Sequence, residues 1–183
     1  MLNQQQTRKT HQVSTANICL LETLIETISP LTDVQYSWKP SGNMSSTGKH
    51  IRHIIDHYHS FLRDGDVIDY DDRSRKTIVE QRVCIARAEL RSIIWLLQNS
   101  TSNSNLGRSK PMYVLISVTP DERPLPVRSS SLRELLFLQS HTIHHMAVIQ
   151  MMLHTLEVSV DPDFSLAPST RAFNTQQKRQ VSL

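Results

Sequence analysis

Histidine is the residue type in this sequence whose spacing most clearly points to chemistry. The chain of 183 residues has nine histidines, and seven of them fall in two short windows. These seven are His50, His53, His57 and His59 in the first window, and His141, His144 and His145 in the second. Neutral imidazole is a common protein ligand for divalent cations. The two windows therefore favour metal binding.

His141 and His145 are the pair with the clearest chelating spacing. On an α-helix, residues four apart lie about 6 Å from each other and direct their side chains the same way. Two imidazoles hold a divalent ion weakly, so a third ligand has to come from another helix. The intervening His144 falls on the opposite side of the helix, where we expect it to face water.

The first window can supply the third ligand. Helical phase places His50 and His57 beside the apolar stripe of their helix and turns His53 roughly 140° from the stripe centre. Phase alone therefore favours His57 or His50, and it points His59 outward. A single histidine beside a core is usually structural, but burying several imidazoles without a ligand is costly. Heme is less favoured, because aromatic residues make up only 5% of the chain.

Apolar periodicity indicates the elements that would position these windows. Residues recurring at intervals of three and four predict amphipathic helices over about 13–30, 46–63, 74–98 and 131–158. Each helix has one apolar face, so the four together predict an all-α domain, a four-helix bundle. A short run at 112–118, rich in β-branched residues, could pair with 125–128 as a small β-hairpin between helices three and four.

Local signals set the expected helix ends. Pro30 ends the first helix, and Ser45, Ser46 or Thr47 can cap the second. Ser131 is the expected cap of the fourth helix, with Glu134 completing a capping box.

Outside the helical domain at 13–160, we expect a flexible N-terminus over 1–12 and an extended C-terminal tail over 161–183. The tail could pack back on the domain through Phe164 and Leu166. The polar segment 100–107 is expected to be a loop.

Composition excludes several other functions. No GxGxxG or GxxxxGK[ST] motif is present, and no apolar run approaches about 18 residues. The net charge is +3, and the tail supplies only Arg171, Lys178 and Arg179 as basic residues. We therefore expect neither nucleic acid nor a membrane as a partner. Cys19 and Cys84 form no CxxC pair, so we expect them to be small core residues of a reduced, cytoplasmic protein.

The two histidine windows also resemble the motifs of a known family. Residues 46–57 (STGKHIRHIIDH) resemble the second-helix signature SxGxHxxHxxxH of the DinB-like superfamily of metal-binding helical proteins, which are distinct from the DNA polymerase of that name. Residues 133–135 (REL) and 140–145 (SHTIHH) resemble its fourth-helix element. The resemblance implies an up-down-down-up bundle holding a divalent ion, zinc or nickel. Carried over by position, the metal ligands are His53, His141 and His145, with His57 and His50 in reserve.

Three neutral imidazoles leave a coordination position open for water or a substrate. The resemblance implies a metal-dependent enzyme acting on a small molecule, either a transferase that uses a low-molecular-weight thiol or a hydrolase. Arg52 or Arg133 could orient an anionic group, although a solvated helix face is the favoured interpretation of both. The alternative is a non-catalytic metal-binding or stress-associated interaction protein, such as a homodimer. It is kept because Asp56 is the nearest carboxylate and neither window holds an obvious general base.

Overall fold

The chain is mainly helical and carries one small sheet. The computed structural model describes residues 2–41, 44–72, 77–99, 106 and 112–181. Its longest helices are α1 (Leu2–Ile28), α3 (Thr47–Leu62), α5 (Val83–Asn99) and α6 (Ser131–Thr155). The prediction of a mainly helical protein is confirmed.

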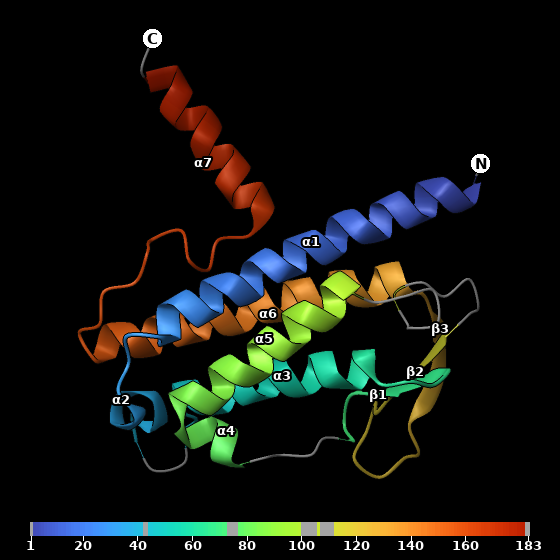
Figure 1. Cartoon of the computed structure of the whole chain (residues 1–183), viewed down its shortest axis with the longest axis horizontal. Helices are drawn as coiled ribbons and strands as arrows, with labels where there is room; N and C mark the ends of the chain where they lie inside the picture. Colours follow the sequence, from blue (N-terminus) through green and yellow to red (C-terminus); the bar gives the residue numbers. More distant parts are fainter. Residues whose placement is uncertain (1, 42–43, 73–76, 100–105, 107–111, 182–183) are drawn as a thin grey trace.

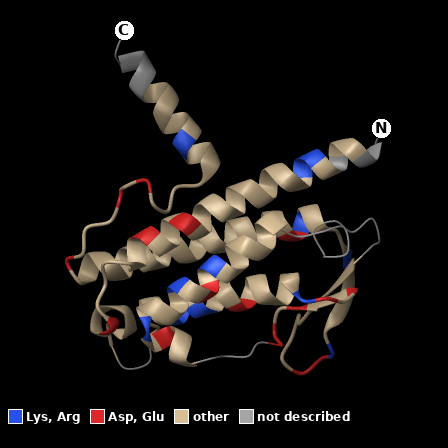
Figure 2. Ribbon diagram, in the orientation of Figure 1, with Lys and Arg blue, Asp and Glu red and all other residues tan. Residues whose placement is uncertain are grey.

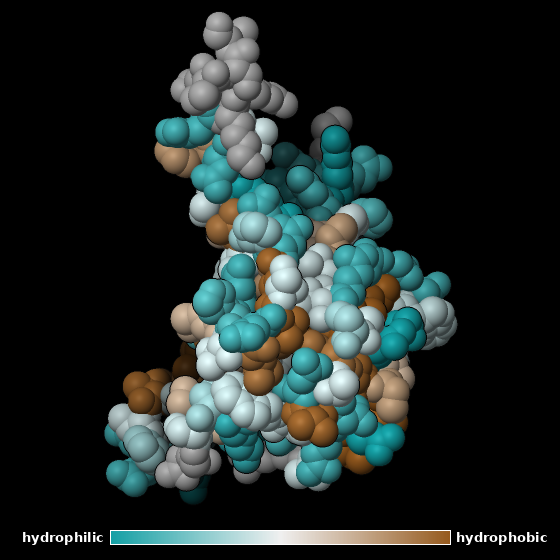
Figure 3. All heavy atoms as spheres, turned by 90° about the vertical axis from the view of Figure 1, so that its left-hand side faces the viewer, coloured by the Kyte–Doolittle hydropathy of each residue, from teal (hydrophilic) through white to brown (hydrophobic). Residues whose placement is uncertain are grey.

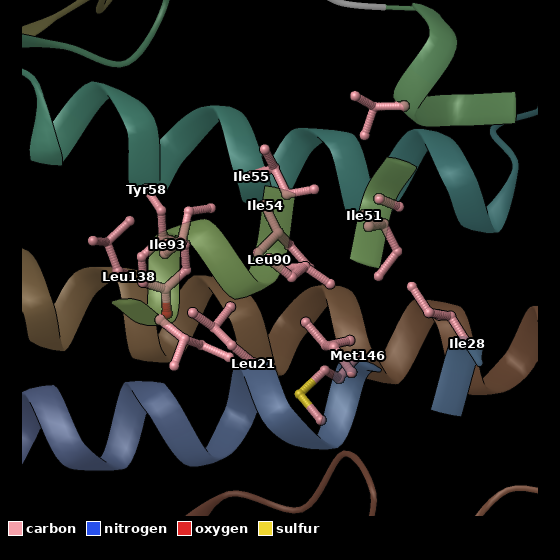
Figure 4. Close-up of a cluster of buried hydrophobic side chains, with 14 of the residues drawn as sticks. Leu21, Ile28, Ile51, Ile54, Ile55, Tyr58, Leu90, Ile93, Leu138 and Met146 are labelled. Carbon is pink, nitrogen blue, oxygen red and sulfur yellow. The ribbon is translucent and has the colours of Figure 1, made fainter. Parts of the chain in front are cut away.

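The four long helices share one apolar core. Helix α1 packs against α5 and α6, and α3 packs against the same two helices (Figure 1). Buried side chains from all four helices meet between them, as Figure 4 shows for Leu21, Tyr58, Ile93, Leu138 and Met146. This contact pattern places α3 beside α6, the two helices that carry the histidine windows.

Helix α1 begins earlier than the sequence suggested. It starts at Leu2, so the polar residues expected to form a separate N-terminal segment belong to the helix. It ends at Ile28, two residues before Pro30, as predicted. The short helix α2 (Asp33–Ser37) was not predicted, although Thr32 and Gln35 form a capping box at its start.

The predicted third helix is divided into two. Helix α4 (Thr77–Gln81) precedes α5, and the expected start at Ser74 lies outside the described residues. At the break, Asp33 accepts a hydrogen bond from the Val83 backbone N–H at 2.9 Å. Helix α4 also packs closely on α3, because a Cβ added to Gly48 would lie 2.0 Å from the Glu80 carbonyl oxygen. Glycine at position 48 is therefore explained by this close approach.

Three short strands form the sheet in the order β1-β2-β3. The predicted hairpin is confirmed: β2 (Met112–Ile116) and β3 (Leu125–Ser129) are antiparallel, with Val114 opposite Val127. Strand β1 (Val67–Asp69) was not predicted, because it lies in a polar connection. It pairs in parallel with β2 and brings the following residue, Tyr70, toward α3. The loop predicted over 100–107 lies outside the described residues except for Leu106.

The caps of α3 and α6 refine the predicted helix ends. Ser46 caps α3 by accepting a hydrogen bond from the Lys49 N–H, so one of the three candidates is confirmed. Helix α6 is capped by Ser130, and the predicted cap at Ser131 is wrong by one residue. The predicted capping box fails with it, because the Glu134 side chain is directed into the interior and is fully buried.

The expected extended tail is only partly extended. Residues after α6 run without helix as far as 167, and α7 (Pro168–Val181) then forms a helix that projects away from the other helices (Figure 1). Phe164 packs into the core with 1% of its surface exposed, as predicted. Cys19 and Cys84 are exposed, so the expectation that they are core residues is wrong.

The surface is mixed in polarity. Among the described residues, Lys and Arg occur on several helices, including α1, α5, α6 and α7 (Figure 2). On the face in Figure 3, apolar side chains are interspersed with polar ones. Among the described residues, no helix combines the length and apolar character needed to cross a membrane.

Candidate metal centre

His53 of α3 and His141 and His145 of α6 converge. One ring nitrogen from each residue lies within 4.8 Å of those of the other two. The ring centroids are 5.0 Å apart for His53 and His141, 4.7 Å for His53 and His145, and 4.5 Å for His141 and His145. All three side chains are half-buried. The residues that the family resemblance implies as ligands are therefore the ones whose nitrogens meet.

Helical phase had favoured His57 or His50 as the third member of this group. Helical phase was misleading because it assumed that the centre of the apolar stripe of α3 faces the other histidines. The edge of α3 that carries His53 faces α6 instead. His57 and His50 instead lie on either side of the converging three, and each contacts one or two of them.

His57 is buried beside the cluster and supports two of its members. Its Nδ1–H donates a hydrogen bond to the backbone carbonyl of His53 at 2.9 Å. Its ring stacks on His141, with centroids 4.2 Å apart, and on Tyr70 at 5.2 Å. Because the rings of His57 and His141 are nearly parallel, at 26°, His57 acts as a packing partner of His141.

His50 contacts the other end of the cluster. Its Nδ1 lies 3.0 Å from Nδ1 of His145, within hydrogen-bonding distance. The two remaining histidines of the windows lie farther out. His144 is exposed, as predicted, while His59 is half-exposed and pairs with Glu89 of α5 at 3.0 Å.

Two aromatic side chains that were not predicted, Phe137 and Tyr70, lie against one side of the centre. The Phe137 ring stacks against His141 at 5.5 Å and also contacts Tyr70 at 5.1 Å. Phe137 could have been found, since it lies one helical turn before His141. Tyr70 had no such signal, because only the pairing of β1 with β2 brings it to α3.

The acidic groups next to the centre are engaged elsewhere. Asp56 is buried and forms an ion pair with Arg52 at 2.5 Å. Arg52 also reaches Glu80 of α4 at 2.5 Å, so the expectation that Arg52 lies on a solvated face is wrong.

Glu134 is the second buried carboxylate in this region. It accepts hydrogen bonds from Tyr70 at 2.8 Å, from Arg133 at 2.9 Å and from Ser129. Burial, together with the Glu134 charge, raises the pKa of the Tyr70 hydroxyl far above its usual range. Tyr70 therefore stays a hydrogen-bond donor to Glu134 at neutral pH.

Burial lowers the pKa of two of these histidines, His145 and His50. It lowers the pKa of His145 to about 4, with smaller contributions from His50, His144 and His57. Burial also lowers the pKa of His50, assisted by the nearby His144 and Lys49. His145 is therefore neutral at pH 7 and has a lone pair on one ring nitrogen.

The donor set fits a borderline cation such as zinc or nickel. Its three converging groups are all imidazoles, which suit these ions, whereas calcium and magnesium prefer oxygen ligands. Nε2 of His141 is buried, so bulk water does not reach this nitrogen.

Part of this chain is similar to a curated protein. FK506-binding protein 5 of Rhizopus delemar is 31% identical to this chain over 105 residues, which is 57% of this chain and 26% of that protein. The chain thus spans about a quarter of the length of the curated relative it matches. No family model matches the chain, and no solved structure matches it.

Proposed function

We propose that the chain binds one divalent ion, zinc or nickel, through His53, His141 and His145. The convergence of one nitrogen from each residue within 4.8 Å carries this proposal. The neutral state of His145 supports it, because a protonated imidazole cannot bind a cation. We also propose that the fold is the up-down-down-up four-helix bundle of the DinB-like superfamily. The motifs at 46–57 and 133–145 support this assignment, as do the contacts of α1 and α3 with α5 and α6.

We further propose that the centre belongs to a metal-dependent enzyme acting on a small molecule. An ion held by three neutral imidazoles would keep its positive charge and lower the pKa of a bound water or thiol. Asp56 and Glu134 are both held in buried contacts, so neither is placed to act as a general base. This favours a nucleophile that the ion deprotonates completely, because a metal-bound thiol is fully deprotonated at pH 7 whereas metal-bound water is deprotonated only in part. A thiol-dependent transferase is therefore preferred over a hydrolase.

The engaged carboxylates also favour a second candidate. A non-catalytic metal-binding protein, such as a stress-associated homodimer, needs no proton-transfer group at all. The two candidates differ in the accessibility of the ion, because an enzyme must keep a coordination position open to a substrate.

Metal analysis of the purified protein tests the site itself. We expect about one zinc or nickel ion per chain. A variant with alanine at His53, His141 and His145 is expected to lose it while keeping its helical circular dichroism. His59→Ala is the matched control, because it removes a histidine of the same helix that contacts Glu89 instead of the cluster. Equal metal content in the triple variant and the wild type would contradict the proposal.

Activity is tested separately, with the metal-loaded protein and a panel of small thiols and electrophiles. We expect turnover that depends on both thiol and metal and that is lost in His145→Ala. Turnover that survives this substitution would exclude the centre as the catalytic site. Metal binding without turnover would instead favour the non-catalytic candidate, provided that added thiols do not coordinate the bound ion.

A further inference from the structure

His50 is not one of the three converging residues, yet its side chain makes a polar contact with the side chain of one of them. Its Nδ1 lies 3.0 Å from Nδ1 of His145, and the two rings are tilted by 40° with centroids 5.1 Å apart. His50 is in the first turn of α3, one turn before His53, and its side chain is half-buried.

This contact restricts where the protons of the two rings can be. A hydrogen bond between two neutral imidazoles needs one nitrogen with a proton and one without. If His145 donates, its proton is on Nδ1 and its Nε2 has a free lone pair. If His50 donates, the proton of His145 is on Nε2, and neither of its nitrogens can bind a cation without losing this contact.

We propose that His50 is a positioning residue, which accepts the Nδ1–H of His145 and thereby holds Nε2 of His145 ready for the ion. The proposal rests on the metal site proposed above. A hydrogen bond to the outer nitrogen of a ligating histidine fixes both the tautomer and the ring orientation. In most such pairs the acceptor is a carboxylate or a backbone carbonyl. Here a second imidazole takes that place, and it adds no negative charge to the centre.

The chain offers variants that separate this role from others. In His50→Asn the amide oxygen takes nearly the place of the imidazole Nδ1, so an acceptor is kept. In His50→Leu the acceptor is lost while most of the side-chain volume stays. His144→Ala is the matched control, because the His144 ring also lies beside His145, at 5.2 Å, but is exposed.

Zinc affinity, measured by competition with a chromophoric chelator, is the first readout. We expect His50→Leu to weaken zinc binding about 10- to 100-fold, and His50→Asn and His144→Ala to stay close to the wild type. Long-range proton–nitrogen correlation spectra of the zinc-loaded wild type are the second readout. They should show His145 protonated at Nδ1 and His50 protonated at Nε2.

Three results would overturn the proposal. Unchanged affinity in His50→Leu overturns the positioning role, provided that thermal unfolding shows the variant to be folded. A metal-bound nitrogen on His50 also overturns it, because His50 would then be a fourth ligand. A wild-type chain that binds neither zinc nor nickel overturns the metal site itself, and the role of His50 with it.

Discussion

Two polar clusters lie side by side between α3 and α6, and they are built in opposite ways. The first joins Tyr58, Asn17 and Thr142, all fully buried. The Tyr58 hydroxyl donates to Asn17 at 2.5 Å and lies 3.3 Å from the Thr142 hydroxyl. The Asn17 amide nitrogen donates to the backbone carbonyls of Val13 and Leu135 at 2.8 and 3.1 Å. The polar groups of this cluster are thus paired with one another or with backbone.

The second cluster is the histidine centre, and it gathers side chains of a single kind. Three imidazoles converge at the half-buried edge of the same two helices, without a carboxylate among them. The two clusters use neighbouring positions, since His57 precedes Tyr58 and His141 precedes Thr142. One polar cluster completes its own hydrogen bonds and stabilises the core. The other brings electron-pair donors together, which is the arrangement a cation requires.

The largest expected difference between the two clusters is in their effect on how much metal the protein binds. We expect His141→Ala and His145→Ala each to reduce bound zinc or nickel from one ion per chain to a small fraction, because two remaining imidazoles bind weakly. The apoprotein should unfold at nearly the wild-type temperature, since these side chains are only half-buried. Metal content and thermal unfolding in the presence of chelator measure the two effects. A large loss of apoprotein stability would mean that the centre is a structural cluster like its neighbour.

The opposite result is expected for Asn17→Ala. It removes the acceptor of the Tyr58 hydroxyl and the donor to two backbone carbonyls, and Asn17 itself is fully buried. We expect a loss of roughly 2 kcal/mol in the free energy of unfolding, with metal content unchanged. Denaturant unfolding measures it, and Cys19→Ala is the control, because it alters an exposed residue of the same helix. Equal stability of the two variants would refute the structural role of the Asn17 cluster.

The two clusters also differ in how far the sequence predicted them. The histidine windows were visible because ligand spacing is local: His141 and His145 are four residues apart on one helix. The Tyr58 cluster gave no signal, since Asn17 and Thr142 are 125 positions apart and meet only after α1, α3 and α6 pack. The division of the third predicted helix had the same cause, because it depends on the contact of Val83 with Asp33 and on the contact of α4 with Gly48.

Where local rules competed with burial, burial prevailed. Glu134 has the spacing of a capping-box residue, but it is drawn inside by Tyr70 and Ser129. Arg52 would be solvated by composition alone, yet Asp56 and Glu80 neutralise it in the interior. Helical phase on α3 placed His53 away from the core and was correct on that point. It could not show that α6 presents its own histidines to the same edge.

A smaller effect is expected where the clusters adjoin. Thr142→Val removes the hydroxyl that lies 3.3 Å from the Tyr58 hydroxyl, while Tyr58 keeps its shorter bond to Asn17. We expect a loss of about 1 kcal/mol in the free energy of unfolding and no change in metal content, although the substituted residue follows His141 directly. Denaturant unfolding and metal analysis of the same preparation test this. Loss of the ion in Thr142→Val would show that the clusters act as one unit.

The smallest expected difference between the two clusters is in how the stability of the apoprotein depends on pH. The pKa of His145 is about 4 in the folded chain, below its usual value of 6.5, so the unfolded chain binds more protons between these two pH values. The contribution of His145 to stability is therefore complete above pH 6.5 and is lost as the pH falls toward 4. The lowered pKa of His50 acts in the same direction. Because both side chains are half-buried, solvent screening keeps the effect modest.

Burial raises the pKa of Tyr58 far above this range, so the stability that its cluster contributes should not change with pH here. Thermal unfolding in chelator from pH 7.5 to 4.5 should show a steeper decline for the wild type than for His50→Asn/His145→Asn, and the same decline for the wild type and Tyr58→Phe. Equal slopes in the wild type and the double histidine variant would show that these imidazoles are not held neutral by the fold.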